Sequence, residues 1–186
     1  MAGRRRGFDR EEVLDQVMRA FWRKGYDATS VADLTELTGV NPPSLYAAFG
    51  AKKALFAEVV ERYARTRGAF AARAAEEEPT ARAAVERVLR EAAARYTDPD
   101  HPRGCLVFSS PELGDLRRAA VAALEARIRR DVVAGALPAD ADPHGLAVFV
   151  AATLGGMSGL ARDGATREEL DHVARAAMSA WPAPVP

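Results

Sequence analysis

Residues 30–50 read SVADLTELTGVNPPSLYAAFG, and this stretch decides the fold. Ser30 followed by Asp33 is typical of a helix start, because each side chain can bond to the backbone amide of the other residue. Gly39 is expected to end this short helix, since glycine reaches positive φ without steric cost. The apolar residues expected to form its buried face are Val31, Leu34 and Leu37.

A second short helix is expected to follow the Gly39 corner directly. Asn41 is a good N-cap, and Pro42 suits the first helical position, where its missing amide is not needed. Leu45 and Phe49 then supply the buried face. Two short helices joined through a glycine corner form the pattern of a helix-turn-helix. The residues left on its outer and flanking faces are Pro43, Ser44, Tyr46, Ala47 and Ala48.

Helical patterns also cover the rest of the chain, and no run of alternating β-branched residues appears. We therefore predict an all-α fold. Asp9 and Glu12 are typical of a helix start with a capping box, and Gly25 ends that helix. A longer connecting helix is expected from about Lys52 to the region of Phe70. The remaining helices are expected after Thr80 and over Leu116–Val133, Leu146–Leu160 and Arg167–Trp181.

Composition and charge narrow the class of protein. The 186 residues are 48% hydrophobic, which allows a sizeable core, so a disordered chain is not expected. Lys and Arg number 26, and so do Asp and Glu, so attraction to nucleic acid has to come from local basic clusters. The first residues do not read as a secretion signal, and no stretch reads as a membrane span. These features predict a cytoplasmic protein.

The local basic clusters lie in the N-terminal quarter, near the predicted helix-turn-helix. Arg4, Arg5 and Arg6 form an arm that is expected to reach an adjacent groove or the backbone of a DNA duplex. The residues expected to contact phosphate are Ser30, Ser44, Tyr46 and Lys52. The polar residues expected to read bases are Asn41 and Ser44, with Pro43 close to the duplex. The alternative is that Tyr46 is a packed surface aromatic and Lys52 a solvated charge.

The first sixty or so residues resemble the TetR family of bacterial regulators. The resemblance lies in FDREEVLDQVMRAFWRKGYDATSVADLTELTGVNPPSLYAAFGAKKALF, residues 8–56. It implies a DNA-binding domain over 1–51 and a ligand-binding and dimerisation domain over 52–186. It also implies a homodimer that binds a palindromic operator and is expected to act as a repressor, released by a small molecule or by modification of Cys105, with activation as the alternative. Two departures are Ala51, where the family commonly has a polar helix cap, and Lys53, where it commonly has an acid.

The dimer is expected to form through the last two helices. The segment Leu146–Leu160 is too apolar to be half exposed, which implies a partner surface. The resemblance suggests that this helix and the last one form a four-helix bundle with their symmetry mates. The residues expected at the interface are Leu146, Val150, Leu154, Val173, Ala177 and Trp181. The alternative is that both are core helices of a monomer.

The sole cysteine, Cys105, allows two interpretations. Lone cysteines are commonly inert buried hydrophobes. If Gly104 instead begins a short helix beside Arg103, Cys105 lies at a positive helix end that favours the reactive thiolate. Its segment is similar to one in electrophile- and oxidant-responsive members of the family. A small-molecule effector would bind in a mostly apolar cavity, and the residues that could line it are Tyr96, Leu106, Phe108, Leu124, Phe149 and Met157. Ordinary core packing explains each of these residues equally well.

Catalysis, metal and cofactors are not expected. The chain has no phosphate-binding Gly-x-x-x-x-Gly-Lys run, and Cys105 with His101 is the one pair of reactive type. A single cysteine excludes an intrachain disulfide and a multi-cysteine zinc site, and His101, His144 and His172 lack metal-ligand spacing. A DNA-binding protein that answers only to a partner protein, with no small-molecule effector, remains the other alternative.

Overall fold

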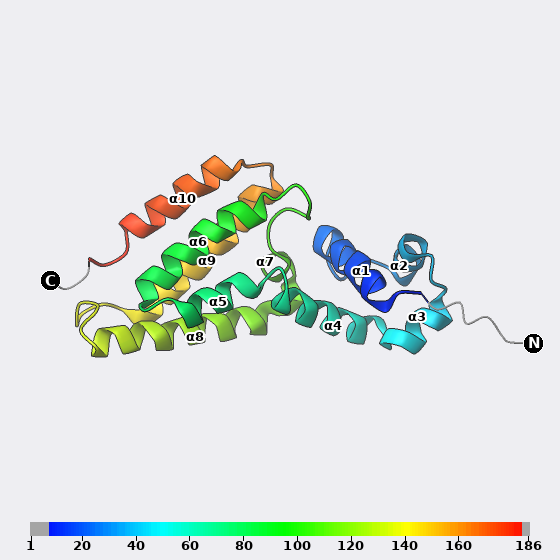
Figure 1. Cartoon of the computed structure of the whole chain (residues 1–186), viewed down its shortest axis with the longest axis horizontal. Coiled ribbons are helices and arrows are strands. Elements are labelled where there is room, and N and C mark those ends of the chain that lie inside the picture. The colour runs from blue at the N-terminus through cyan, green and yellow to red at the C-terminus, as the bar shows by residue number, and fades with distance from the viewer. Residues whose placement is uncertain (1–7, 184–186) are drawn as a thin grey trace, which may run out of the picture. The chain divides into compact units, whose positions relative to one another are not determined.

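The computed structural model describes residues 8–183. Within that range the secondary structure is helical throughout, so the predicted all-α fold is confirmed (Figure 1). The chain forms two compact units that divide between Thr66 and Arg67. The first contains α1 (Arg10–Lys24), α2 (Val31–Thr38), α3 (Pro42–Phe49) and α4 (Lys52–Arg65). The second contains α5 (Ala69–Glu77), α6 (Ala81–Tyr96), α7 (Leu106–Ser109), the 3-10 helix η1 (Pro111–Leu113), α8 (Gly114–Val133), α9 (Pro143–Arg162) and α10 (Arg167–Ser179).

The first three helices begin at polar caps. The Asp9 carboxylate accepts hydrogen bonds from the amides of Glu11 and Glu12 at 2.9 and 3.2 Å, which satisfies donors that have no partner inside the helix. Ser30 and Asp33 form the predicted capping box. Gly39 has φ of 67° and ends α2 in the left-handed conformation. These local signals therefore fix where the helices start and turn.

Aromatic side chains pack in pairs within the core of the first unit. Phe21 meets Phe56 edge to face, with ring centroids 5.1 Å apart, and Trp22 meets Tyr63 in the same way at 5.0 Å. The expected burial of Leu37 is wrong, since this side chain is 49% exposed. A two-turn helix packs along one narrow line, and in α2 that line runs through Leu34, which is fully buried.

Helix α4 is shorter than expected and belongs to the first unit. It ends at Arg65, where the Thr66 hydroxyl donates to the Arg62 carbonyl at 2.7 Å, and α5 begins separately at Ala69. The Arg62 guanidinium donates to Asp15 at 3.1 Å and also contacts Glu11, so α4 is tied to α1. The compact unit therefore extends one helix beyond the expected division between residues 51 and 52.

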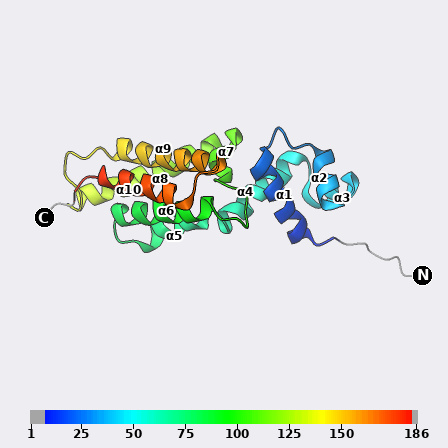
Figure 2. The same ribbon diagram turned by 90° about the horizontal axis from the view of Figure 1, so that it is seen from above.

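In the second unit, α8 and α9 run side by side, and α6 packs against both α5 and α10 (Figures 1 and 2). Two side chains of α8 hold helix ends in place. Asp131 accepts from the first amide of α6, at Ala81, and Arg127 donates to the carbonyls of Ala75 and Glu78 at the end of α5. The fully buried side chains at the centre of this unit include Leu89, Leu106, Ile128, Met157 and Leu170.

Candidate nucleic-acid interface and sensor segment

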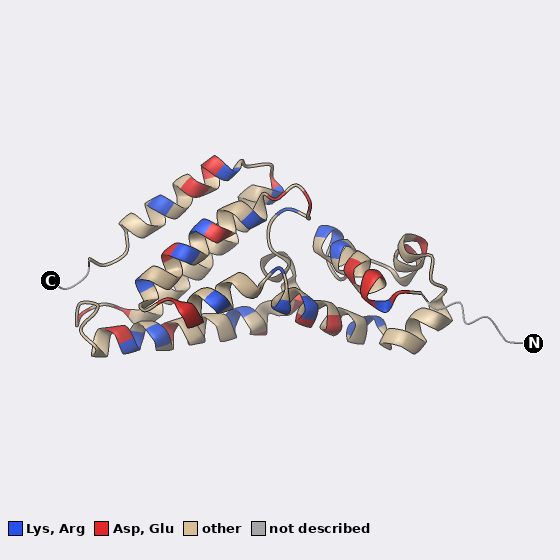
Figure 3. Ribbon diagram, viewed as in Figure 1, with Lys and Arg blue, Asp and Glu red and all other residues tan. Residues whose placement is uncertain are grey.

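The outer face of α3 is exposed and uncharged. Leu45 and Phe49 are buried, whereas Tyr46 is 46% exposed. No residue of α3 carries a charge, which Figure 3 shows against its charged neighbours. The side chains exposed on this helix are Pro42, Pro43, Tyr46 and Ala47. The helix therefore presents an aromatic hydroxyl among small apolar groups, a surface that can approach a base-pair edge closely.

The polar groups at the start of α3 are already partly engaged. The Asn41 side-chain oxygen accepts a hydrogen bond from the backbone amide of Ser44 at 2.9 Å. This bond leaves the amide hydrogens of Asn41 as donors for another partner. Asn41 is exposed and Ser44 is half-buried.

Ser30 acts first as a helix cap. Its hydroxyl donates to the Asp33 carboxylate at 2.7 Å and accepts from the Asp33 amide at 3.1 Å. Hydrogen bonds from the Ser30 hydroxyl and amide, followed by the bond from Lys24, lower the pKa of Asp33 to about 2. The expected phosphate contact of Ser30 thus competes with a bond that holds α2 in shape.

Lys52 starts α4 beside an aromatic ring. Its ammonium lies 4.2 Å from the centroid of the Tyr26 ring, a cation–π contact that holds the charge in place. Ala51 gives α4 no side-chain cap, in keeping with the loss of the usual polar residue. The neighbouring Lys53 is exposed. The expected arm of Arg4, Arg5 and Arg6 lies outside the described residues.

Arg10 holds the far end of α3, a role that no pattern in the sequence indicates. Its guanidinium donates to the Glu58 carboxylate at 2.5 Å and lies 4.5 Å from the centroid of the Phe49 ring. It also reaches the Ala48 carbonyl at 3.5 Å. One side chain of α1 therefore joins the end of α3 to α4.

Cys105 is buried and lies just before α7 rather than within it. Its backbone amide donates to the Ser158 hydroxyl at 2.9 Å. The Arg103 guanidinium donates to the carbonyl of Ala161 in α9 at 2.9 Å and to that of Ala165, just after α9, at 3.0 Å. The effect of Arg103 on the Cys105 thiol stays a prediction.

The residues expected to line an effector cavity occupy different environments. Tyr96, Leu106 and Met157 are core residues, and Phe108 and Leu124 are half-buried. Phe149 is exposed on the surface of α9, so it does not face the interior. Sequence spacing could not separate these cases, because α9 is apolar on every side.

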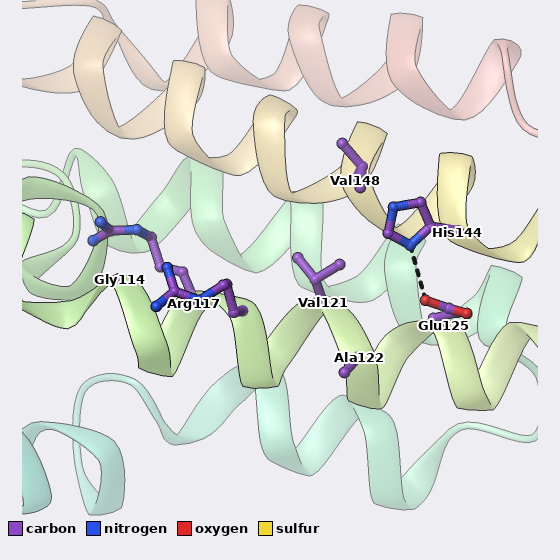
Figure 4. A pocket seen from close by; sticks show the side chains of 8 residues that line it. Gly114, Arg117, Val121, Ala122, Glu125, His144 and Val148 are labelled. Carbon is purple, nitrogen blue, oxygen red and sulfur yellow. Dashed lines mark hydrogen bonds and ion pairs between the residues drawn. The ribbon is translucent and has the colours of Figure 1, made fainter.

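A groove of about 480 Å³ runs between α8 and the start of α9 (Figure 4). At one end the His144 ring contacts the Glu125 carboxylate at 2.9 Å, and bonds from His144 and then Arg129 lower the pKa of Glu125. The lining residues, none of them among those expected for the effector, are Gly114, Arg117, Arg118, Val121, Ala122, Glu125, His144 and Val148.

The exposed apolar face of the second unit lies on α8 and α9, not on α10. Of the residues expected at a dimer interface, Val150, Ala177 and Trp181 are buried within the chain, and Leu146, Leu154 and Val173 are half-buried. The large apolar side chains exposed on α8 and α9, which we call the α8–α9 face, are Leu116, Val133, Val148, Phe149 and Leu160. By length and composition alone, helix α9 is also long and apolar enough to cross a membrane, and 28% of its apolar stretch is buried in the structure.

The described residues contain no cluster of three or more His, Cys, Asp or Glu side chains that could hold a metal ion. The candidate surfaces are therefore two: the uncharged outer face of the helix-turn-helix in the first unit, and the exposed apolar side chains of the second unit.

Residues 13–59 match the profile of bacterial regulatory proteins of the tetR family. The chain is 35% identical to the HTH-type transcriptional repressor ComR of Escherichia coli K12, over 97% of this chain and 92% of that protein. It is 36% identical to the repressor BdcR of the same organism, over 95% and 90% of the two chains. A solved structure of the TetR family regulator CifR, a cysteine mutant complexed with 26-bp double-strand operator DNA, is 40% identical with a TM-score of 0.88, covering 96% of this chain and 100% of that one.

This chain belongs to the TetR family and is a DNA-binding transcriptional regulator. The predicted family and the predicted helix-turn-helix fold are confirmed. Reduced NemR from E. coli, at 17% identity and a TM-score of 0.72, shares the fold.

Proposed function

We propose that the chain is a cytoplasmic repressor that binds a palindromic operator as a homodimer and leaves it when an effector acts on the second unit. The observation that carries the proposal is the uncharged, exposed outer face of α3, which Arg10 and the caps hold in one orientation. Two similar proteins are named transcriptional repressors, and CifR was solved with double-strand operator DNA, which supports repression through operator binding.

In this proposal α3 lies in the major groove, as the second helix of a helix-turn-helix does. Tyr46 and the amide of Asn41 supply hydrogen-bond donors, and Pro43 and Ala47 make apolar contacts of the kind that suit a thymine methyl group. Lys52 and Ser44 contact phosphate, and Arg4, Arg5 and Arg6 reach the adjacent groove or backbone. Ser30 contributes through the capping box that holds α2.

The proposed partner of the α8–α9 face is a second copy of the chain. The α9 residues Phe149 and Val148, adjacent in sequence, are 39% and 45% exposed, and large apolar side chains exposed together suit an interaction site. Gly156 and Gly159 have open space around them, so another helix can approach closely there. A two-fold dimer would place two recognition helices about 34 Å apart, one turn of DNA.

The proposed signal is either a small molecule or a covalent change at Cys105. In the covalent case, the Cys105 thiol loses its proton to solvent, and the thiolate sulfur forms a bond to one carbon of an activated carbon–carbon double bond, such as that of N-ethylmaleimide. The π bond breaks, and its electron pair takes up a proton from water at the other carbon. Cys105 is only 6% exposed, so the segment has to open before the reaction, and the added group keeps it from closing. The effector-bound form then has lower operator affinity, because the effector binds the two forms unequally. No catalytic role is proposed for any residue.

Fluorescence anisotropy with promoter DNA tests this function, at two salt concentrations and with and without an electrophile such as N-ethylmaleimide. The parent is expected to bind with steep salt dependence and to release DNA on treatment. Cys105→Ser is expected to bind equally well and to resist release. Release from the variant as from the parent would reject the covalent signal, and steep salt dependence with no effector response would favour control by a partner protein.

A further inference from the structure

The segment from Arg103 to Ser110 is held by two neighbouring helices at once. On one side lies the end of α9, and on the other lies the first half of α8. Cys105 and α7 lie within this segment. The contacts on the two sides come from different helices, so a substitution can remove those on one side while the residues on the other side are kept.

The α9 side is a close fit between backbones. Gly104 has φ of 79°, and a Cβ atom added there would lie 2.8 Å from both the carbonyl oxygen and the hydroxyl of Ser158. Only glycine fits this approach. The Ser158 hydroxyl, itself buried, accepts the amide of Cys105 at 2.9 Å. Arg103 adds its bonds to Ala161 and Ala165, so three successive residues of the segment are docked on α9.

The α8 side depends on one arginine. The Arg117 guanidinium donates to the carbonyl of Val107 at 2.6 Å and to that of Ser110 at 2.7 Å. Helix α7 has only four residues, so most of its carbonyls have no partner within the helix. Arg117 supplies a charged donor to this short helix at its C-terminal end.

We infer that Arg117 and Ser158 are positioning residues that clamp α7 between α8 and α9 and so control access to the Cys105 thiol. Because Cys105 and Leu106 are buried, a group added to the sulfur has no room while both contacts hold. Opening the segment removes a contact from α8, α9 or both, the helices that carry the α8–α9 face. The link from Cys105 to the dimer rests on the proposed function, whereas the clamp itself does not.

The test is the rate at which Cys105 displaces iodide from iodoacetamide in the folded protein, followed by mass spectrometry. Arg117→Met is expected to raise the rate about tenfold, since hydrogen bonds from a charged donor contribute about that factor to a local opening equilibrium. Ser158→Ala is expected to raise it about threefold, as the loss of one neutral hydrogen bond. Arg117→Lys, which keeps a charged donor, is expected to restore most of the protection.

The matched control is Arg130→Met, at an exposed arginine of the same helix, which is expected to react at the parent rate. Urea below the unfolding transition is expected to leave the accelerated rates unchanged, because local opening exposes little surface. Parent-like rates in both Arg117→Met and Ser158→Ala would overturn the clamp. So would an equal acceleration in Arg130→Met, or a rate that rises with urea as global unfolding does.

The same samples separate the clamp from the proposed function. Alkylated parent is expected to show a dimer dissociation constant raised several-fold in sedimentation experiments. An unchanged dimer constant and unchanged operator affinity after alkylation would reject Cys105 as a signal while the reaction rates still report on the clamp. Parent-like rates in the variants, together with DNA release by alkylation, would reject the clamp alone.

Discussion

Helices α3 and α9 both expose a surface with little or no charge, yet they suit different partners. Helix α3 has eight residues and no charge, and α9 has twenty residues with Arg162 as its one Lys or Arg and no Asp or Glu. Around α3 lie hydroxyls, amides and the Lys52 ammonium, groups that bind phosphate and base edges. On α9 the exposed large side chains are the apolar Val148, Phe149 and Leu160, and on the neighbouring α8 they include Leu116 and Val133. The side chains that surround such a helix, rather than the helix alone, indicate what it binds.

The largest effect is expected from a charge on the α8–α9 face. Phe149→Asp places an unpaired carboxylate in the proposed interface, where desolvation is costly, and should raise the dimer dissociation constant by about 100-fold or more. Analytical ultracentrifugation measures it. Ala176→Asp, at an exposed site on α10, is the matched control and is expected to leave the dimer intact. Loss of the dimer in the control variant but not in Phe149→Asp would mean that the dimer interface lies on α10 and not on the α8–α9 face.

A smaller effect is expected on α3. Tyr46→Ala removes ring and hydroxyl contacts from each half-site and should weaken operator binding about tenfold or more, with the helix content unchanged. Tyr46→Phe keeps the ring and is expected to lose only part of that affinity. Anisotropy titrations and far-UV circular dichroism provide the two measurements. Unchanged affinity in the alanine variant would mean that Tyr46 is a surface aromatic and not a DNA contact.

A substitution of Lys52 tests whether its positive charge, which lies beside α3, contacts a DNA phosphate. Lys52→Met should lower the slope of log affinity against log salt by about one for each protomer and weaken all DNA sequences alike. Glu61→Gln, an exposed charge change on the same helix, is the control. A slope equal to that of the parent would leave Lys52 as a partner of the Tyr26 ring only.

The smallest effect is expected in the acid stability of the first unit. The pKa of Asp33 falls from 3.8 to about 2 on folding, so its capping bonds stabilise the native state fully above pH 3.8 and are lost as the pH falls through about 2. Asp33→Asn should therefore lower the thermal midpoint at pH 5 and make little difference near pH 2. Glu36→Gln, on the same helix, is the control. A thermal midpoint of Asp33→Asn that stays equally far below that of the parent at pH 2 would contradict the role of this carboxylate.

The sequence predicted the local parts of this structure well because their causes are local. Caps at Asp9 and Ser30, the Gly39 corner and the buried pair on α3 depend on residues within one helical turn. Arg10 could not be found in this way, since its partners lie 38 and 48 positions along the chain. Arg117 was missed for a related reason, because an arginine on an amphipathic helix reads as solvated.

The dimer residues show a second limit. Apolar spacing along α9 predicted a buried helix but could not say which side faces the chain's own core. The structure buries Val150 and Met157 and exposes Val148 and Phe149, all of which look alike in sequence. The predicted burial of Leu37 was wrong for a similar reason, since the neighbouring helices determine how wide a strip of α2 is buried.

Selection of bound DNA from a pool of random duplexes, followed by sequencing, measures most directly whether paired α3 helices read DNA. The parent is expected to enrich an inverted repeat whose half-sites lie about one helical turn apart, and Tyr46→Ala is expected to enrich it weakly. No enrichment by the parent, or enrichment of a single unpaired site, would contradict the regulator that binds as a two-fold dimer through α3.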